Sequence, residues 1–205
     1  MIIKINPVNP QQRLIRKVVG VLKDGGVIAY PTDTIYGLGC DLYQKEAIKR
    51  IHRLKRHNKN KRLSIICADL KDISNYAYVP DYAYRIMRKL IPGPYTFILE
   101  ATKLVPRIML TNQKTVGIRV PDNEISLALV RELGHPIITT SVTKPDESLY
   151  NNPEEIAPMF GKALDLVIDG GTIVAEHSSI VDLTGDNSRV LRVGKGDVSF
   201  IPEGA

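Results

Sequence analysis

The sequence predicts an α/β fold, with one sheet and helices packed against it. Segments with the helical apolar period alternate with short apolar, β-branched runs along nearly the whole chain. With 205 residues, 43% of them hydrophobic, the chain can enclose one substantial core but not two ordinary domains. We therefore expect a single domain over residues 1–205, with its core over about 8–200.

Apolar residues at helical spacing predict two helices in the first third of the chain. The first runs from Asn9 to about Asp24, with Asn9 as its cap and Pro10 in its first turn. The second runs from about Gln44 to Arg56 and leaves its remaining faces to basic residues. Apolar runs before, between and after these helices predict strands over 2–5, 26–30 and 63–67.

The same alternation continues to the end of the chain. A helix over about 81–91 is broken by Pro92-Gly-Pro94, and another helix is expected over 123–133. Gly, Asp and Asn turns separate the later apolar runs. These runs predict strands over 95–99, 115–120, 136–143, 166–171, 178–182 and 190–192.

Residues 30–39, Tyr-Pro-Thr-Asp-Thr-Ile-Tyr-Gly-Leu-Gly, place a hydroxyl-rich loop directly after a predicted strand. Pro31 ends the strand, and the two glycines permit close approaches that a Cβ would block. Hydroxyls and backbone amides beyond a strand end suit an anionic small molecule. Two interpretations are open: a ligand site at Thr32 and Thr34, or a turn whose threonines satisfy only local backbone groups.

The predicted strand over 115–120 carries an unexpected arginine. Its apolar residues share one face, and Thr115, Gly117 and Arg119 share the other. An arginine on a strand that looks buried needs an anion or an acid as its partner. Arg119 is therefore a candidate ligand-binding residue.

Hydroxyl and cationic side chains also end other predicted elements. They are Thr32, Thr34, Thr139, Thr140, Ser141, Thr143, Ser178, Ser179, Arg192 and, at a helix end, Lys55. The chain contains no G-x-x-x-x-G-K-[ST], G-x-G-x-x-G or G-x-S-x-G pattern, which disfavours the familiar nucleotide folds and an acyl-transfer serine. Dispersed donors without a nucleophile suit a site that aligns substrates and neutralises phosphate charge.

The net charge of +6 and the pI near 9.3 indicate polyanionic partners. Basic residues crowd into the stretch from Lys49 to Arg62. This run is either a solvated face or a phosphate-binding or RNA-binding patch. The patch would comprise Lys49, Arg50, Arg53, Arg56, Lys59, Lys61 and Arg62.

Neither the cysteines nor the histidines show metal-ligand spacing. Cys40 and Cys67 are expected to be small buried hydrophobes, with Cys40 close enough to the 30–39 motif to lie near a ligand. The four histidines are expected at structural or surface positions, so no metal site is predicted. No apolar stretch is long enough to cross a membrane, and we expect a cytoplasmic protein.

Ordered motifs cover almost the full length of the chain. They are Gly25–Gly39, Leu54-Lys-Arg56, Pro92-Gly-Pro-Tyr-Thr-Phe97, Val116-Gly-Ile-Arg-Val-Pro121, Thr140-Ser-Val-Thr143, Ile168-Asp-Gly-Gly171, Ser178-Ser-Ile-Val-Asp182 and Leu191-Arg-Val-Gly194. Through these motifs the chain resembles the YrdC/YciO domain family, which includes threonylcarbamoyl-AMP synthases. The stretches 9–15 and 95–103 are more similar to the YciO branch. The resemblance implies a single YrdC-like domain, a twisted mixed sheet with a positively charged concave face.

The resemblance also implies a reaction. L-Threonine and bicarbonate form a carbamate that attacks the α-phosphate of ATP, giving threonylcarbamoyl-AMP for modification of tRNA adenosine 37 and releasing pyrophosphate. Mg²⁺ would accompany the triphosphate. Catalysis would rest on Lys55 and Arg119. By motif position, ATP would be bound by Lys55, Thr115, Ser141, Thr143 and Arg192, and threonine by Thr32, Arg119, Thr139 and Ser178.

Two positions depart from the synthase pattern. The usual arginine after the second helix is His57, and the usual asparagine of the Ser-x-Asn element is Thr143, which lacks the two N–H donors of an amide. Each change removes a contact worth on the order of 1.5–3 kcal/mol, enough to slow the reaction. Two alternatives to a full synthase stay open: a weakened YciO-type paralogue, and a non-catalytic protein that binds double-stranded RNA or tRNA on its basic concave face.

Overall fold

The computed structural model describes residues 1–55, 63–110, 112–144 and 148–201. Its helices are α1 (Gln12–Lys23), α2 (Lys45–Leu54), α3 (Leu70–Tyr76), α4 (Asp81–Leu90), α5 (Glu124–Leu133) and α6 (Pro153–Phe160), with 3-10 turns η1 (Arg107–Met109) and η2 (Gly161–Ala163). Its strands are β1 (Ile2–Lys4), β2 (Ile28–Tyr30), β3 (Gly37–Asp41), β4 (Ser64–Ile66), β5 (Ala77–Tyr78), β6 (Tyr95–Ala101), β7 (Thr115–Arg119), β8 (Ile137–Ser141), β9 (Leu166–Asp169), β10 (Ser179–Asp182) and β11 (Arg189–Arg192).

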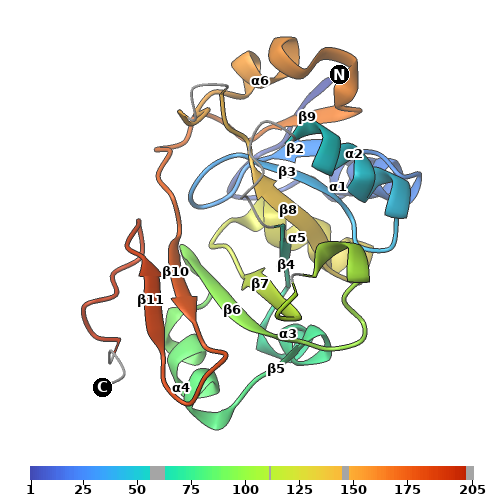
Figure 1. Ribbon diagram of the computed structural model, residues 1–205. Helices are drawn as coiled ribbons and strands as arrows, with labels where there is room; N and C mark the ends of the chain where they lie inside the picture. Colours follow the sequence, from blue (N-terminus) through green and yellow to red (C-terminus); the bar gives the residue numbers. More distant parts are fainter. Residues whose placement is uncertain (56–62, 111, 145–147, 202–205) are drawn as a thin grey trace.

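One sheet runs through the molecule (Figure 1). Its strand order is β1-β9-β2-β3-β8-β4-β7-β6-β10-β11, and β5 pairs with the end of β6. Parallel pairs such as β6 with β10 stand beside antiparallel pairs such as β6 with β7, so the sheet is mixed. The predicted α/β fold with a mixed sheet is confirmed.

The two faces of the sheet carry different cores. The larger hydrophobic cluster packs one face against α2, α3, α4 and α6. The second cluster packs the other face against α1 and α5, over β1, β9, β2 and the adjoining ends of β4 and β8. Because side chains alternate along a strand, residues of β6, β7 and β10 that point away from the larger cluster border a cavity instead.

The strand over 115–120 follows its predicted alternation. Val116, Ile118 and Val120 belong to the larger hydrophobic cluster. Gly117 and Arg119 lie on the opposite face of β7, and Arg119 lines the cavity. The alternation therefore aims Arg119 away from the core.

The first helix begins later than predicted. Gln11, not Asn9, occupies the cap position of α1, and its side chain makes no capping hydrogen bond. Asn6 organises the preceding turn, because its Oδ1 accepts hydrogen bonds from the backbone N–H groups of Val8 and Asn9 at 2.9 and 3.0 Å. The prediction that Asn9 caps the helix and Pro10 opens it is wrong.

The apolar period does not predict α3 or α6, which have 7 and 8 residues. Both begin at a side-chain cap: Asp69 accepts a hydrogen bond from Asp72 N, and Asn152 accepts one from Glu154 N. Two turns are too short for a helical period to stand out. Their caps, and for α6 also Pro153 at its first position, are the local signals that mark them.

The 30–39 motif folds as a hairpin rather than as a strand followed by a loop. β2 ends at Tyr30, residues 31–36 form the turn, and Gly37 and Gly39 lie in β3, antiparallel to β2. A Cβ on Gly39 would come within 2.7 Å of the Tyr30 ring, and one on Gly37 within 2.9 Å of Thr139 Oγ1. The two glycines therefore serve close packing inside a strand.

Both cysteines are buried, as predicted. Burial raises the pKa of the Cys40 thiol to about 12, and it also raises the pKa of Cys67. Cys40 belongs to the larger hydrophobic cluster and is not among the residues that line the cavity, so the structure gives no support to the expectation that it lies near a ligand. No helix in the described ranges has the length and apolar character needed to span a membrane.

The side chains of Asp41 and His135 contact each other where β3 ends and β8 begins. His135 Nε2 lies 2.7 Å from Asp41 Oδ1, which also accepts a hydrogen bond from Tyr43 N at 2.8 Å. Burial raises the pKa of Asp41, but the hydrogen bonds from His135 and Tyr43 outweigh burial and leave that pKa below its ordinary value. The pair therefore stabilises the fold only while Asp41 is ionised.

We predict that Gly39→Ala lowers the free energy of unfolding by about 1–3 kcal/mol, because the new methyl group overlaps the Tyr30 ring. Urea denaturation measures the loss. Gly20→Ala in α1 is the matched control: no atom lies within 4 Å of its added Cβ, so about 1 kcal/mol of stability should be gained. Equal responses of the two variants would contradict the packing explanation.

We predict that Asp41→Asn weakens the acid dependence of stability. A carboxyl group with a depressed folded-state pKa contributes stability above its unfolded-state pKa of about 4, and this contribution is lost as pH falls through the folded-state pKa. Urea denaturation at pH 6, 4 and 3 should show a smaller loss of unfolding free energy on acidification than in the wild type. An unchanged slope would show that Asp41 does not couple folding to pH.

Candidate functional site

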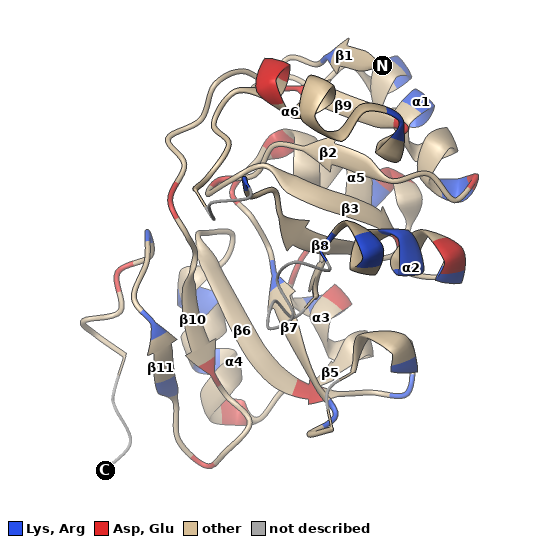
Figure 2. Cartoon of the chain, turned by 45° about the horizontal axis from the view of Figure 1, so that its top comes forward, with Lys and Arg blue, Asp and Glu red and all other residues tan. Residues whose placement is uncertain are grey.

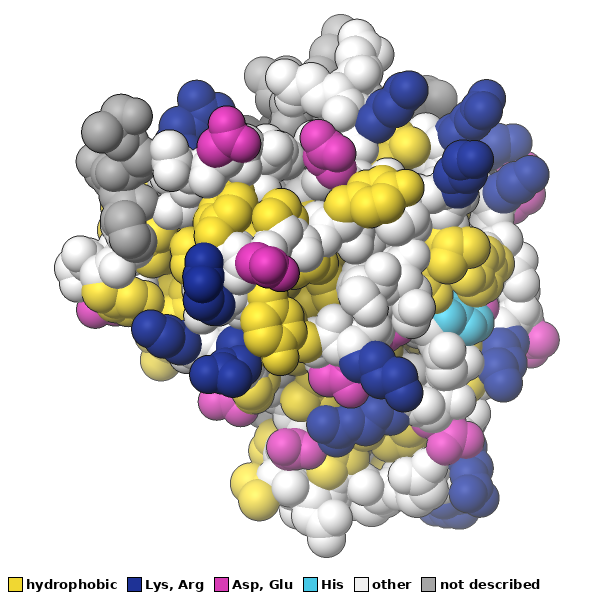
Figure 3. All heavy atoms as spheres, turned by 90° about the horizontal axis from the view of Figure 1, so that it is seen from below, with side chains coloured by type: hydrophobic (Ala, Val, Ile, Leu, Met, Phe, Trp, Pro, Cys, Tyr) yellow, Lys and Arg dark blue, Asp and Glu magenta, His cyan; other side chains and the backbone are white. Residues whose placement is uncertain are grey.

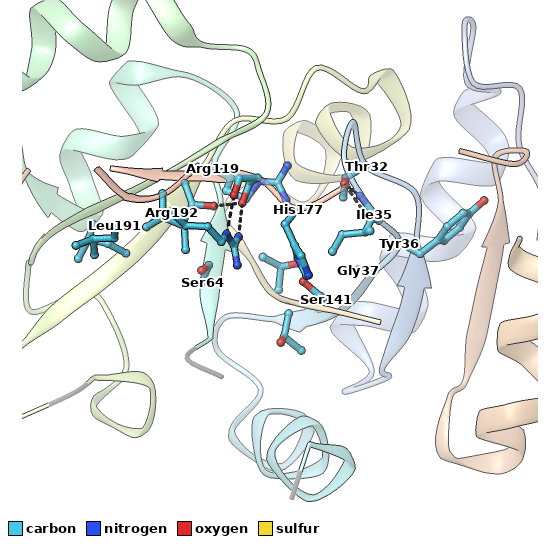
Figure 4. A pocket seen from close by; sticks show the side chains of 16 residues that line it. Thr32, Ile35, Tyr36, Gly37, Ser64, Arg119, Ser141, His177, Leu191 and Arg192 are labelled. Atoms are coloured by element: carbon cyan, nitrogen blue, oxygen red, sulfur yellow. Dashed lines mark hydrogen bonds between the residues drawn. The ribbon is translucent and has the colours of Figure 1, made fainter. Parts of the chain in front are cut away.

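A cavity of about 390 Å³ opens on the face of the sheet that α1 and α5 leave uncovered (Figure 4). Its walls come from the 31–36 turn and from β3, β4, β6, β7, β8, β10 and β11. Of the nine residues predicted to bind ATP or threonine, the structure brings six together here: Thr32, Arg119, Thr139, Ser141, Ser178 and Arg192.

Arg119 lines the cavity and is almost fully buried. Its Nη2 donates to Asp33 Oδ1 at 2.6 Å, and the two side chains are only 10% and 7% exposed. Its Nε has no hydrogen-bond partner, and no other fully buried side-chain nitrogen or oxygen among the described residues shares this condition. A buried donor without a partner costs free energy, so Arg119 is poised to bind an acceptor.

Arg192 brings a second guanidinium into the cavity beside Arg119 (Figure 4). Its Nε donates to Ser178 O at 2.9 Å and its Nη2 to Ser178 Oγ at 3.2 Å, while Ser178 Oγ also lies 2.8 Å from Thr96 Oγ1. Burial lowers the pKa of Arg192, and the nearby charge of Arg119 lowers it further. Two cations so close together favour an anion between them.

Thr32 lines the cavity, yet its hydroxyl is engaged in the local turn. It donates to Ile35 O at 2.6 Å and accepts from the backbone N–H groups of Thr34 and Ile35 at 3.1 and 3.2 Å. A hydroxyl has one donor and two acceptor positions, so these contacts fill its capacity. Thr32 therefore closes the turn, as the second interpretation has it, and the turn forms a wall of the cavity that Thr34 does not line; ligand binding at Thr32 stays a prediction.

The floor of the cavity is a row of small and hydroxyl residues across neighbouring strands. Ser64 pairs in register with Gly117 on one side and with Thr139 on the other. A Cβ on Gly117 would lie 2.6 Å from Ser64 Oγ, so only glycine leaves this space open. The side chain of Thr139 is held in place by the buried Tyr30 hydroxyl, which donates a hydrogen bond to Thr139 Oγ1 at 2.7 Å.

Three of the nine predicted residues are not among those that line the cavity. Lys55 and Thr143 contact each other, with Lys55 Nζ donating to Thr143 Oγ1 at 3.0 Å. Thr115 lies at the opposite end of β7 from Arg119, four residues and therefore roughly 13 Å away along the strand. Lys55 therefore contacts Thr143, one of the two positions that depart from the synthase pattern. Thr115 lies away from the cavity.

The structure describes only part of the basic run over residues 49–62. Arg56, His57, Lys59, Lys61 and Arg62 lie outside the described residues. Figure 2 shows basic and acidic positions side by side along α2. Lys49 pairs with Glu46 at 2.7 Å and Arg50 with Asp165 at 2.8 Å, while Arg53 is exposed. Two of the three described members of the predicted patch therefore have acidic partners.

The underside of the molecule mixes both signs of charge. Figure 3 shows hydrophobic side chains gathered there, with basic and acidic side chains scattered around them. On β5 and α4, which lie low in Figure 1, Tyr78 is 60% exposed and Tyr84 is 45% exposed. This face is not a surface of a single charge sign.

The residue patterns alone did not assign several residues that line or support the cavity. His177 lines it although a surface or structural position was expected, and its only local signal is that it precedes Ser178. Thr96 occupies the cavity-facing side of a predicted strand. Asp33 lies inside the motif, but its partner Arg119 is 86 residues away and no local pattern links the two.

The comparisons with known proteins agree with this geometry. A model of the Sua5/YciO/YrdC family, described as telomere recombination, matches residues 20–194. The chain belongs to the Sua5/YciO/YrdC family. The family assignment drawn from the motifs is therefore confirmed.

Relatives within the family include both YciO and synthases. The uncharacterized protein YciO of Escherichia coli K12 is 44% identical over 196 residues, 95% of each chain, and a crystal structure of E. coli YciO matches with a TM-score of 0.93 at 42% identity over 97% of this chain and 98% of that one. A putative threonylcarbamoyl-AMP synthase of Methanocaldococcus jannaschii is 34% identical over 199 residues, 94% of this chain and 92% of that protein. Sua5 of Pyrococcus abyssi complexed with L-threonine matches with a TM-score of 0.87 at 29% identity, covering 95% of this chain and 57% of that one.

Proposed function

We propose that this chain is a nucleotidyltransferase of the threonylcarbamoyl-AMP synthase type, which joins L-threonine, bicarbonate and ATP. The unpartnered, buried Nε of Arg119 beside Arg192 carries the proposal, because such a cavity favours an anionic ligand. Synthases among the relatives and a family structure with L-threonine support the choice of substrate.

In this proposal Arg119 binds the threonine carboxylate, since a guanidinium fork matches a planar anion. Thr32, Thr139 and Ser178 form the wall around the amino acid. Lys55 and Arg192 neutralise charge on the triphosphate, and the Ser141 hydroxyl donates a hydrogen bond to it. Thr143 contacts Lys55, and Thr115 is assigned by resemblance alone. A carbamate oxygen bonds to the α-phosphorus of ATP while pyrophosphate leaves with the electron pair of the broken P–O bond, and the cations stabilise the charge on the phosphoryl oxygens.

Mg²⁺ fits this site through the nucleotide rather than through protein ligands. No cluster of three or more His, Cys, Asp or Glu side chains is placed to hold a metal in the part of the chain that the structure describes. Mg²⁺ usually keeps several waters and binds phosphate oxygens, so a hydroxyl-lined cavity accommodates it with the triphosphate. When bound, it would supply charge neutralisation between the phosphates.

The proposed product serves tRNA adenosine 37 modification in the cytoplasm. The Lys55–Thr143 contact bears on the strength of the activity, because Thr143 stands where synthases carry asparagine. A hydroxyl accepts from Lys55 but offers only one donor to a phosphate, so turnover slower than that of a full synthase is expected. Binding of double-stranded RNA or tRNA rests on the basic run alone and stays a prediction.

The decisive experiment incubates the purified protein with ATP, L-threonine, bicarbonate and Mg²⁺ and follows pyrophosphate release and the adenylate product. We expect threonine-dependent pyrophosphate together with threonylcarbamoyl-AMP. A folded preparation that releases no threonine-dependent pyrophosphate would refute the enzymatic proposal. Salt-sensitive binding of double-stranded RNA in that preparation would then favour the accessory protein.

We predict that Lys55→Ala abolishes ATP binding, measured by calorimetry, and leaves the thermal unfolding temperature nearly unchanged. Lys55 ends α2 and is half-buried, and its removal leaves the Thr143 hydroxyl without this donor. Lys49→Ala is the matched control, because Lys49 pairs with Glu46 on the exposed side of the same helix and should not affect ATP. A large loss of thermal stability in Lys55→Ala would instead assign the lysine a structural role.

A further inference from the structure

We infer that Asp33 is a positioning residue, which fixes the guanidinium of Arg119 so that its remaining N–H groups meet the carboxylate of the ligand. The identity of that ligand rests on the proposed function. The positioning role rests on contacts within the chain. Neither the motif resemblance nor the proposed roles assign any task to Asp33.

Both carboxylate oxygens of Asp33 have partners. Oδ1 accepts from Arg119 Nη2 at 2.6 Å, and Oδ2 accepts from Asp122 N at 3.1 Å. Asp122 lies three residues beyond Arg119, so the carboxylate bridges the end of β7 and the segment that follows it. An aspartate held at both oxygens presents its partner in one orientation, because it cannot rotate without breaking the second bond.

The backbone of the Asp33 turn is also fixed, by the segment that carries the other cavity residues. Lys195 Nζ donates to Asp33 O at 2.6 Å, and Glu176 N donates to Thr34 O at 3.2 Å. Residues 176–195 include Ser178 and Arg192, so these bonds connect opposite walls of the cavity. Asp33 is therefore held both at its carboxylate, by Arg119 and Asp122, and at its backbone carbonyl, by Lys195.

Charge and geometry give this pair a role beyond stability. An arginine has five N–H donors in a rigid plane, so fixing Nη2 also fixes the directions of the others. The Nε of Arg119 is buried and has no partner, which a purely structural ion pair would not require. Asp33 therefore restrains the guanidinium and leaves donors open for a ligand.

The opposite role is also testable. An aspartate that competes with the ligand for Arg119 would hold the arginine in a blocked state, and its removal would strengthen carboxylate binding. Positioning and competition therefore predict changes of opposite sign in affinity. The sign of the change in affinity for a carboxylate ligand decides between positioning and competition.

The first arm of the test needs no ligand. Nitrogen-15 NMR of the full chain follows the Arg119 Nε–Hε group, assigned by its loss in Arg119→Lys, and the rotation of its guanidinium. We expect rotation to be faster by on the order of tenfold in Asp33→Asn, where the charge-assisted bond is weakened. Asp182→Asn is the matched control, because Asp182 pairs with the exposed Arg189 at 3.4 Å. A guanidinium equally restrained in Asp33→Asn would overturn the proposal.

The second arm uses L-threonine and L-threoninol, which lacks the carboxylate, in calorimetric titrations. We expect Asp33→Asn to weaken threonine binding about ten- to a hundredfold and to leave threoninol binding nearly unchanged, so that the preference for the carboxylate falls. Lys195→Ala should shift the preference in the same direction by less, because it loosens only the turn. An unchanged or increased preference would overturn positioning.

The two arms separate this proposal from the proposed function. If the wild type binds no threonine, the proposed function fails while the NMR arm still decides whether Asp33 restrains Arg119. If Asp33→Asn unfolds, Lys195→Ala keeps the ion pair and allows both measurements. The inference is supported if Asp33→Asn loses both the restraint of the Arg119 guanidinium and the preference for the carboxylate.

Discussion

The two-residue period of the central strands is the constraint on which the rest of the structure depends. In β6 and β7, every second residue enters the larger hydrophobic cluster, and the residues between them face the other way. Helices α1 and α5 cover only one half of that other face. The remaining half can therefore carry hydroxyls, glycines and arginines without disturbing the core, and this is where the cavity lies.

Two arginines at one cavity, Arg119 buried and Arg192 half-buried, shape its electrostatics. Asp33 offsets the charge of Arg119, whereas the described contacts of Arg192 are neutral oxygens of Ser178. Among the described contacts, the cavity thus keeps a positive charge on Arg192 that no carboxylate pairs with. An anion that enters relieves both the charge of Arg192 and the unpartnered donor of Arg119. Ligand binding and stability are linked in such a site, since a ligand that binds only the folded state stabilises it.

The sequence allowed much of the fold and a large part of the site to be predicted. Arg119 could be found because an arginine interrupts a strand of period two, and the hydroxyls of Thr139 and Ser178 mark strand ends. Family resemblance grouped these residues before any geometry was known. The hairpin glycines were located, although their place inside β3 depends on a ring that packs from the preceding strand.

What escaped prediction depends on contacts between distant parts of the chain. Asp33 meets Arg119 across 86 residues and Lys195 across 162, and neither separation leaves a periodic trace in the sequence. Cavity-facing Thr96 looks like any other strand threonine until its partner Ser178 is placed beside it. Local sequence patterns indicate toward which face of the sheet a side chain points. Which distant residues become neighbours on that face depends on the order of the strands in the sheet.

The parallel pairing of β6 with β10 has a consequence for how the protein is made. One edge of β6 pairs with β7, and β5 covers the other edge only at Glu100 and Ala101. The rest of that edge stays open until Ser179–Asp182 docks against Tyr95–Ile98. During synthesis the chain must therefore extend past Asp182 before that edge is covered, and past Lys195 before the cavity has all its walls. Until then the nascent protein presents an unpaired strand edge of the kind that chaperones shield and that joins other chains in aggregates.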